Sequence, residues 1–337
     1  MTLMAEELGP ARTEALQQAA RAAGVPERLV EQVVLRAPAR EAAGWAVAGV
    51  PAAGPDDSAS AGPTTTLVAC DLDRTLIYST AAIQLGTHGS LVPPMVVAEV
   101  HHGRATSFVT VDAGALLEIL AAQAVLVPCT TRTTEQYARV RLPGPLPGYA
   151  VTANGGRILV DGRPDAGWSR QVGDRLEAGG VPLTEVVQHL LAVQDPRWLL
   201  KLRTVEDLFA YLVVERAELP PTLVEDLTHW CAERGWNVSL QGRKLYCVPT
   251  ALTKGDAIAE VASRVGASRT FAAGDSLLDA ELLARADLSV RPAHGELHDQ
   301  GWTTPGLSVT DEPGLLGGQE VVARLLAAVL ALEVDRA

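Results

Sequence analysis

Two aspartates spaced by one residue give the clearest chemical signal in this chain. Asp71 and Asp73 follow the apolar run 67–70, and Thr75 comes two positions later. Alternate residues of an extended chain point the same way, so both carboxylates lie where a buried strand ends, the usual ligand position in open α/β sheets. Adjacent negative charges need a cation or a shared proton. The pattern predicts metal-assisted chemistry with one carboxylate as nucleophile and the other as acid/base, although turn-forming aspartates at a strand end would look the same.

Residues suited to a phosphate group follow two later segments. Thr130, Thr131 and Arg132 come after the apolar run 124–127. A hydroxyl and free N–H groups at a helix start suit a phosphate oxygen, but simple N-capping also explains a threonine there. Lys254 opens a helix, where a cation is unfavourable. Its position therefore indicates that it neutralises carboxylates or a transferring phosphoryl group.

A second pair of carboxylates follows a later strand. Asp275 comes directly after Gly274, and Asp279 lies one helical turn further on. A helix cap explains Asp275 but not Asp279. Sites that are rich in oxygen ligands and lack imidazole suit Mg²⁺.

The segments that carry these residues alternate between strands and helices. We expect strands at 67–70, 124–127, 150–153, 270–273 and 288–290. Helices are expected at 113–123, 254–265 and 277–286, with a final amphipathic helix at 319–332. This alternation predicts a Rossmann-like parallel sheet.

The pattern changes between residues 156 and 249. Hairpins are expected from residue 158 and at 236–248, helices at 181–191 and 223–231, and strands at 198–202 and 209–214. This composition predicts an inserted α+β module. Its charged residues Lys201, Arg203, Arg243 and Lys244 are candidates for holding an anionic leaving group, although charged residues in strands more often face solvent.

The domain organisation follows from these segments and from a linker. Residues 11–37 are expected to be helical, and residues 51–63 are rich in Pro, Gly, Ala and Ser. We expect an N-terminal helical appendage at 1–50, a linker at 51–65, a catalytic core at 66–155 and 250–337, and a cap domain at 156–249. The appendage is either a docking element for a protein partner or a layer packed on the core.

Composition limits the partners. The chain has 337 residues, 47% of them hydrophobic, and a net charge of −12. A negative surface disfavours nucleic acid and anionic membranes as partners, so an anionic substrate must meet local cations. No signal peptide and no apolar stretch long enough to span a bilayer are evident. The four cysteines lack metal-ligand spacing and are expected to be reduced core residues of a cytoplasmic protein.

With its motifs in this order, the chain resembles the haloacid dehalogenase superfamily of aspartate-nucleophile phosphatases. The motifs are Asp71-Leu-Asp73-Arg-Thr75, Thr130-Thr-Arg132, Lys254-Gly255 and Gly274-Asp275-Ser-Leu-Leu-Asp279. The insert resembles the type-two cap of sugar-phosphate phosphatases, as in sucrose-phosphate phosphatase, mannosyl-3-phosphoglycerate phosphatase and phosphomannomutase, and Asn154-Gly155 is similar to that subgroup. The segments 71–79 and 130–137 also resemble phosphatase-like proteins of tellurite-resistance gene clusters.

The resemblance implies roles for these residues. Asp71 attacks phosphorus to form an aspartyl-phosphate, and Asp73 protonates the leaving oxygen and then deprotonates water. The phosphate oxygens are held by Thr130, Thr131 and Lys254. Supporting roles fall to Thr75, Arg132 and Asn154.

The resemblance also implies a Mg²⁺ site. The ion is held by Asp71, the main-chain carbonyl of Asp73, and Asp275, with Asp279 binding directly or through water. Two positions depart from the family pattern: Leu278 replaces the usual Asn, and Thr131 replaces the usual Gly. Both change the surroundings of the site without removing a catalytic group.

The sequence thus predicts a Mg²⁺-dependent phosphatase acting on a small phosphorylated metabolite, similar to a sugar phosphate. Asp73 suits an alkoxide leaving group. A phosphomutase would use the same aspartates, and a non-catalytic phosphate-binding or regulatory protein with a degenerate site is the alternative from another class. The stretch 86–110 is expected to form a flap, with His88, His101 and His102 on the surface.

Overall fold

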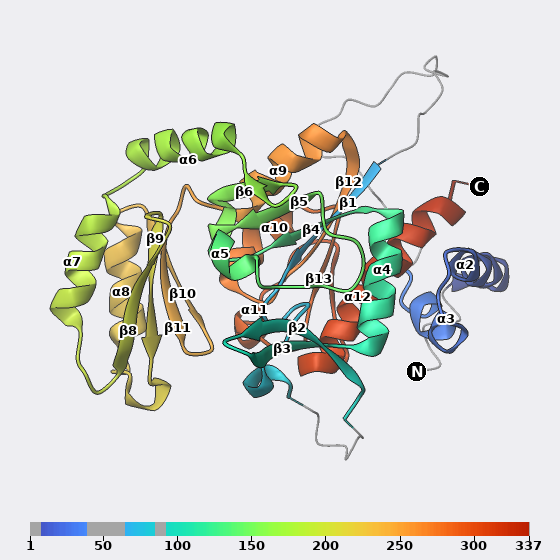
Figure 1. The fold of residues 1–337 in the computed structure, drawn as a ribbon, viewed down its shortest axis with the longest axis horizontal. Coiled ribbons are helices and arrows are strands. Elements are labelled where there is room, and N and C mark those ends of the chain that lie inside the picture. Colours follow the sequence, from blue (N-terminus) through green and yellow to red (C-terminus); the bar gives the residue numbers. More distant parts are fainter. Residues whose placement is uncertain (1–7, 39–64, 85–91, 337) are drawn as a thin grey trace.

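A central eight-stranded sheet organises the molecule in the computed structural model, which describes residues 8–38, 65–84 and 92–336 (Figure 1). The strand order is β14-β13-β12-β1-β4-β5-β6-β7. The parallel strands are β1 (Thr65–Asp71), β4 (Val125–Cys129), β5 (Tyr149–Thr152), β12 (Ala267–Ala273), β13 (Leu288–Arg291) and β14 (Leu307–Val309). An antiparallel hairpin, β6 (Arg157–Val160) and β7 (Arg163–Pro164), completes one edge. The Rossmann-like core predicted from the sequence is confirmed.

Helices cover both faces of this sheet, which explains the continuous apolar run in β1. Val68 and Cys70 point into a cluster with α4 (Val111–Gln123) and α12 (Gly314–Val334). Leu67 and Ala69 point the other way, into a cluster with α9 (Lys254–Val265) and α10 (Ala280–Arg285). The expected helix at 254–265 is thus present with the bounds that the sequence predicts.

The C-terminal helix differs from the sequence-based expectation. α12 is longer than residues 319–332 and is buried on most sides rather than amphipathic. It is also long and apolar enough to cross a membrane by length and composition, with Glu320 and Arg324 interrupting its apolar residues. Because 78% of its apolar window is buried inside the protein, α12 is the helix around which one half of the core packs.

The N-terminal helices pack on α12. Leu16 of α2 (Pro10–Ala22) and Leu29 and Val33 of α3 (Glu27–Val34) belong to the same buried cluster as α12. Arg12 also pairs with Asp335 at 2.9 Å. Of the two alternatives, the described residues show a layer packed on the core, and a protein partner for it stays a prediction. Residues 51–64 of the expected linker lie outside the described residues.

The insert contains a four-stranded antiparallel sheet. Its strand order is β10-β11-β9-β8, from β10 (Trp236–Gln241), β11 (Lys244–Pro249), β9 (Phe209–Val214) and β8 (Leu199–Val205). Figure 1 shows this sheet between the core and the helices α7 (Leu183–Val193) and α8 (Leu223–Ala232). The hairpin expected from residue 158 forms, but it extends the core sheet, so the expected boundary at residue 156 falls inside that sheet. The sequence did not predict helix α6 (Ala166–Ala178).

A separate two-stranded hairpin occupies the stretch expected to form a flap. It comprises β2 (Met95–His101) and β3 (Arg104–Thr110). His101 and His102 are exposed, as predicted, whereas His88 lies outside the described residues. Short elements complete the fold: η1 (Thr80–Ala82), α5 (Thr134–Tyr137), η2 (Ala153–Gly155), η3 (Arg216–Glu218), η4 (Leu277–Asp279) and α11 (Glu296–Asp299). All four cysteines are buried and free.

Candidate active site

The strand order brings the predicted site residues together. β1 lies between β4 and β12, with Asp71 opposite Cys129 and Cys70 opposite Ala273. Thr130 and Asp275 follow the neighbouring strands by one and two residues. Because parallel strands end at the same edge, their side chains gather beside Asp71.

A buried lysine connects two of the carboxylates. Lys254 begins α9, and its Nζ donates to Oδ1 of Asp71 and to Oδ1 of Asp279, both at 2.6 Å. The side chain is only 1% exposed. Burial opposes its charge, but Asp279 and Asp71 outweigh burial and raise the pKa of Lys254. The lysine is therefore a fixed cation between two carboxylates.

Three carboxylates form a cluster around this lysine. Single oxygens of Asp71, Asp275 and Asp279 lie within 4.8 Å of one another, and all three residues are buried. Burial raises the pKa of Asp71 to about 7, and Asp279 and Asp73 add to the increase while Lys254 opposes it. Burial, with Asp71 and Asp279, also raises the pKa of Asp275 well above its usual range. The excess negative charge and the all-oxygen ligand set fit a divalent cation such as Mg²⁺.

Asp279 is already hydrogen-bonded through both of its oxygens. Oδ1 accepts from Lys254, and Oδ2 accepts from the backbone N–H of Ser276 at 3.0 Å and from its hydroxyl at 2.7 Å. Gly274 is required here, since a Cβ at that position would lie 2.4 Å from Asp279. These contacts fix the loop that carries Asp275.

Asp73 belongs to a chain of ion pairs. Arg132 donates to both of its oxygens, from Nε at 2.7 Å and from Nη2 at 2.8 Å. The Nη1 atom of Arg132 lies 3.0 Å from Oε2 of Glu99 on β2. Burial opposes ionisation of Asp73, but its bidentate pair with Arg132 outweighs burial, and the pKa of Asp73 is lowered. Asp73 is thus held as a carboxylate.

Glu99 was missed by the sequence reasoning. It is buried on the hairpin, where Arg132, Arg139 and the hydroxyl of Ser107 contact its carboxylate. A glutamate inside the largely apolar segment 95–100 was the available signal, because a buried carboxylate requires partners.

The predicted phosphate-binding threonines lie at the same edge. Thr130 is fully buried, and its hydroxyl oxygen accepts from the N–H of Arg132 at 3.1 Å, which leaves its proton free to donate. The hydroxyl of Thr131 donates to Tyr246 of the insert at 3.4 Å. The buried hydroxyl of Thr75 has no hydrogen-bond partner among the described residues.

Asn154 supports Lys254 through the backbone. Its Nδ2 donates to the carbonyl of Leu252 at 3.0 Å. Gly155 has a left-handed φ of 97°, and a Cβ there would lie 2.0 Å from the carbonyl oxygen of Thr253. The Asn154-Gly155 turn therefore packs directly against the segment that begins α9.

The loop after Asp73 is fixed by a neutral histidine. The carbonyl of Arg74 accepts from the hydroxyl of Tyr78 and from Nε2 of His294, both at 2.8 Å. Nδ1 of His294 accepts from the N–H of Gly314, so Nε2 carries the proton. Burial lowers the pKa of His294 to about 4. The sequence reasoning missed His294, which lies 220 residues from Arg74.

One carboxylate bonds both to the insert and to the loop after Asp275. Oε2 of Glu296 accepts from the hydroxyl of Ser239 at 2.5 Å and from the N–H of Leu277 at 3.0 Å. Its Oε1 accepts from the N–H of Leu240 at 2.9 Å. Glu296 therefore holds strand β10 against the edge of the core sheet that carries Asp275.

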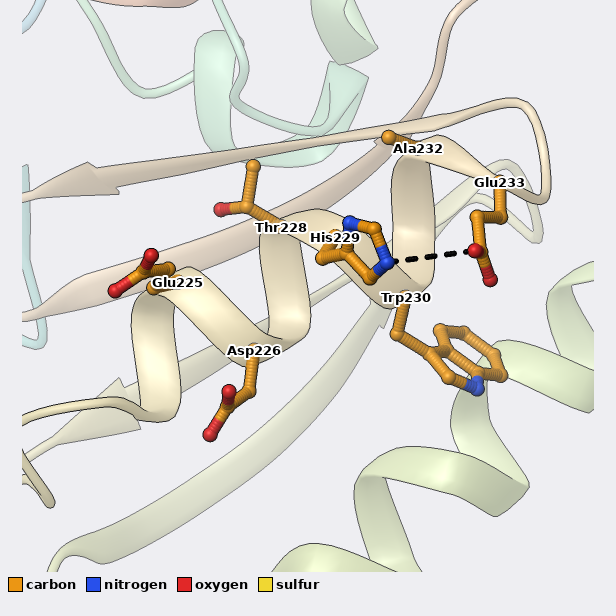
Figure 2. Close-up of a pocket in the computed structure, with 7 residues that line it drawn as sticks. All are labelled: Glu225, Asp226, Thr228, His229, Trp230, Ala232 and Glu233. Carbon is orange, nitrogen blue, oxygen red and sulfur yellow. Dashed lines mark ion pairs between the residues drawn. The ribbon is translucent and has the colours of Figure 1, made fainter.

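A hollow of about 720 Å³ elsewhere on the insert contains none of these residues. Figure 2 shows its lining along helix α8, where His229 pairs with Glu233 at 3.4 Å. The lining residues are Glu225, Asp226, Thr228, His229, Trp230, Ala232 and Glu233. It lies on the helical layer of the insert and includes none of the carboxylates of the candidate active site.

The fold matches that of a sucrose-phosphatase from Synechocystis sp. PCC6803. The two chains are 16% identical, the match covers 78% of this chain and 98% of that one, and the TM-score is 0.52. The chain thus shares with that protein a Rossmann-like core sheet carrying an inserted cap, which confirms the fold expected from the sequence. At this identity the likeness concerns the fold alone.

Two further solved structures are similar over a comparable share of the chain but have TM-scores below 0.5, so no argument rests on them. A Thermoplasma acidophilum protein is 11% identical, with coverage of 79% and 100% and a TM-score of 0.49. A haloacid dehalogenase-like hydrolase from B. subtilis is 13% identical, with coverage of 77% and 98% and a TM-score of 0.46. No protein-family model matches the sequence, and neither does any curated protein sequence.

Proposed function

We propose that this protein is a Mg²⁺-dependent phosphatase that hydrolyses a small phosphorylated metabolite, similar to a sugar phosphate, through an aspartyl-phosphate. The observation that supports this most strongly is the pair Asp71–Lys254, buried at the edge of the sheet beside Asp73 and Asp275. A nucleophile, an acid/base and phosphate-binding groups then lie within one site.

The first step joins Asp71 to phosphorus. A carboxylate oxygen of Asp71 forms the new bond to phosphorus while the ester bond to the leaving oxygen breaks, and Asp73 donates a proton to that oxygen. The side chains of Lys254, Thr130 and Thr131 hold phosphate oxygens. Asp279 keeps Lys254 in place through its 2.6 Å contact. Positioning and charge neutralisation supply most of the catalysis in phosphoryl transfer.

The second step restores the enzyme. Asp73, now a carboxylate, takes a proton from water as the water oxygen attacks phosphorus and the bond to Asp71 breaks. The pair with Arg132 suits this basic form of Asp73. The pair must open before Asp73 can take up the proton for the first step, and Glu99 then gives Arg132 a second ionic partner.

Mg²⁺ would be held by Asp71, Asp275 and the main-chain carbonyl of Asp73, and when bound it neutralises the carboxylates and the phosphoryl oxygens. Because both oxygens of Asp279 are hydrogen-bonded, we assign Asp279 to holding Lys254 and Ser276. A contact from Asp279 to the ion through water is compatible with this assignment.

Phosphate release from a panel of sugar phosphates, nucleotides and p-nitrophenyl phosphate tests the proposal. We expect turnover with Mg²⁺, none with EDTA, and a loss of about 10⁴-fold in Asp71→Asn. Turnover that survives in Asp71→Asn would refute the role of Asp71. Transfer of phosphate between positions of one sugar, without net release, would identify a mutase. The absence of both reactions would favour a binding protein.

A further inference from the structure

The sheet of the insert turns one face to its own helices and the other to the catalytic edge. Directly paired residues of antiparallel strands share a face. The register places six residues on one face: Lys201, Arg203, Tyr211, Val213, Lys244 and Tyr246. Tyr246 accepts a hydrogen bond from Thr131 of the core, so this face lies toward the site. Leu245 and Cys247, on the opposite face, are buried in the cluster that includes α7 and α8.

Three residues of this face are cations without an ionic partner in the described part of the chain. Lys201, Arg203 and Lys244 are exposed, and none lies within 4.0 Å of a carboxylate there. Arg203 donates only to the main-chain oxygen of Leu202, and Lys244 lies 5.7 Å from the ring centre of Tyr211. Such a cationic face on a chain of net charge −12 attracts anions.

Arg74 adds a fourth cation from the core. Its backbone has a left-handed φ of 69°, a conformation that is uncommon for residues other than glycine. Its Nη1 lies 3.9 Å from the position of a Cβ on Gly242, in the turn between β10 and β11. Its Nε lies 3.5 Å from Asp275 without a hydrogen bond. The guanidinium therefore reaches from the catalytic edge to the turn just before Lys244.

Both cations lie near Asp73. Arg74 is its neighbour in the chain, and Lys244 comes two residues after Gly242, whose Cβ position lies 3.9 Å from Nη1 of Arg74. Asp73 is the residue that contacts the leaving oxygen in the proposed reaction. The part of the substrate attached to that oxygen consequently lies between Arg74 and Lys244.

We propose that the leaving group carries a second anionic group, a carboxylate or a second phosphate, and that Arg74 and Lys244 bind it from the two sides. This inference rests on the proposed function, because it assumes that the phosphate lies at Asp71. Lys201 and Arg203 extend the cationic face along the sheet, and the rings of Tyr211 and Tyr246 lie beside it, with centroids 5.4 Å apart.

Binding of phosphonates that cannot be hydrolysed tests the inference. Isothermal titration calorimetry on the full chain with Mg²⁺ would compare alkylphosphonates with phosphonoacetate, 3-phosphonopropionate and 4-phosphonobutyrate, each acid against the alkyl compound of the same length. We expect the wild type to bind at least one of these acids about tenfold more tightly than the alkylphosphonate of the same length, because the carboxylate adds charge-assisted contacts. Lys244→Gln and Arg74→Gly should each reduce that ratio to about twofold. Glycine fits the backbone at position 74, so this variant should fold.

Arg170→Gln provides the control, because Arg170 is an exposed arginine on α6 of the same insert. It should keep the wild-type ratio. No preference at any length, no phosphonate binding, or an unchanged ratio in both site variants would overturn the inference. If the acids bind more tightly than the alkylphosphonates but no phosphate ester is hydrolysed, the proposed phosphatase activity is refuted and the anion site is still supported. If esters are hydrolysed but the acids bind no more tightly, only the anion site is refuted.

Discussion

Lys254 in the core and Lys244 in the insert carry the same charge in opposite surroundings. Lys254 is 1% exposed and contacts two carboxylates at 2.6 Å. Lys244 is exposed and has an aromatic ring rather than a carboxylate beside it in the described residues. The core has its charges in place before any ligand arrives. The insert leaves charges unpaired, so its face depends on an anion from outside.

The same contrast holds for two arginines. Arg132 makes a bidentate pair with Asp73 and contacts Glu99 as well. Within the described part of the chain, Arg203 donates only to the carbonyl of the residue before it. The difference fits the proposed function, in which the core would supply a fixed chemical step and the insert would supply selectivity. The variants below change residues of the core, of the insert, and of the contact between them.

Removing the acid/base from the core should have the largest effect. In Asp73→Asn, we expect kcat for a sugar phosphate to fall about 10²–10⁴-fold, because an alkoxide leaving group needs a proton. The loss should be smaller for p-nitrophenyl phosphate, whose leaving group is stable as an anion. Steady-state kinetics on both substrates checks this. Asp207→Asn, in an exposed turn of the insert, is the control and should leave both rates unchanged. Equal losses on the two substrates would contradict an acid role for Asp73.

Removing each lysine in turn compares the two regions directly. Lys254→Met leaves Asp71 and Asp279 buried without their cation, which should lower the free energy of unfolding by about 3–5 kcal/mol. Lys244→Met breaks no ion pair with any of the described residues and should change the free energy of unfolding by less than about 0.5 kcal/mol. Urea unfolding at neutral pH measures both. Similar losses in the two variants would show that Lys244 is part of the structure rather than available to a ligand.

Acid should weaken the loop that follows Asp73. His294 stays neutral in the folded protein because burial lowers its pKa to about 4, whereas it takes up a proton near pH 6.5 when unfolded. The unfolded state therefore binds more protons as the pH falls from about 6.5 to 4, and stability decreases by about 3 kcal/mol over that range. Urea unfolding at several pH values measures this decrease. His294→Gln should be less stable at pH 7 and should lose less on acidification, and a parallel pH dependence would contradict the assignment.

A smaller effect than that of His294 is expected where the two regions meet. Glu296→Gln replaces one acceptor oxygen by an NH₂ donor, which faces either the N–H of Leu240 or the pair formed by the Ser239 hydroxyl and the Leu277 N–H, and this should cost about 1–2 kcal/mol. Hydrogen exchange should become faster at the amide of Leu240 and stay unchanged within β1. Glu225→Gln, on the exposed surface of α8, serves as the control. Unchanged exchange at Leu240 would show that Glu296 does not hold β10.

The sequence predicted the parts of the site that depend on strand ends. Asp71 and Asp275 each follow an apolar run, and parallel strands end at one edge, so their proximity follows from the pattern. The cluster of carboxylates agrees with that prediction. The pair Asp73–Arg132, the burial of Glu99 and the contact between His294 and Arg74 could not be predicted. They join segments far apart in the chain and depend on side-chain geometry that no local pattern encodes.

Local patterns also explain the errors in the fold. Neighbouring helices and strands surround α12, so its residues are apolar on nearly all sides. The sequence-based prediction assumed a single apolar face and therefore made this helix too short. In the hairpin at 157–164, apolar and polar residues alternate as in any hairpin. Its own residues therefore do not show which sheet it joins. The sequence thus predicted which helices and strands exist more reliably than it predicted which other elements they pack against.

The buried cluster that contains Leu67 and Ala69 of the core also contains Phe209 and Trp236 of the insert. Cap and core therefore share apolar burial, and the insert cannot unfold without exposing side chains that also pack on the core. A calorimetric scan should show one cooperative transition for both. An insert exchanged with that of a related phosphatase would have to bring a matching apolar surface with it, so selectivity in this protein should change more readily through single residues on the open sheet face than through exchange of the whole cap.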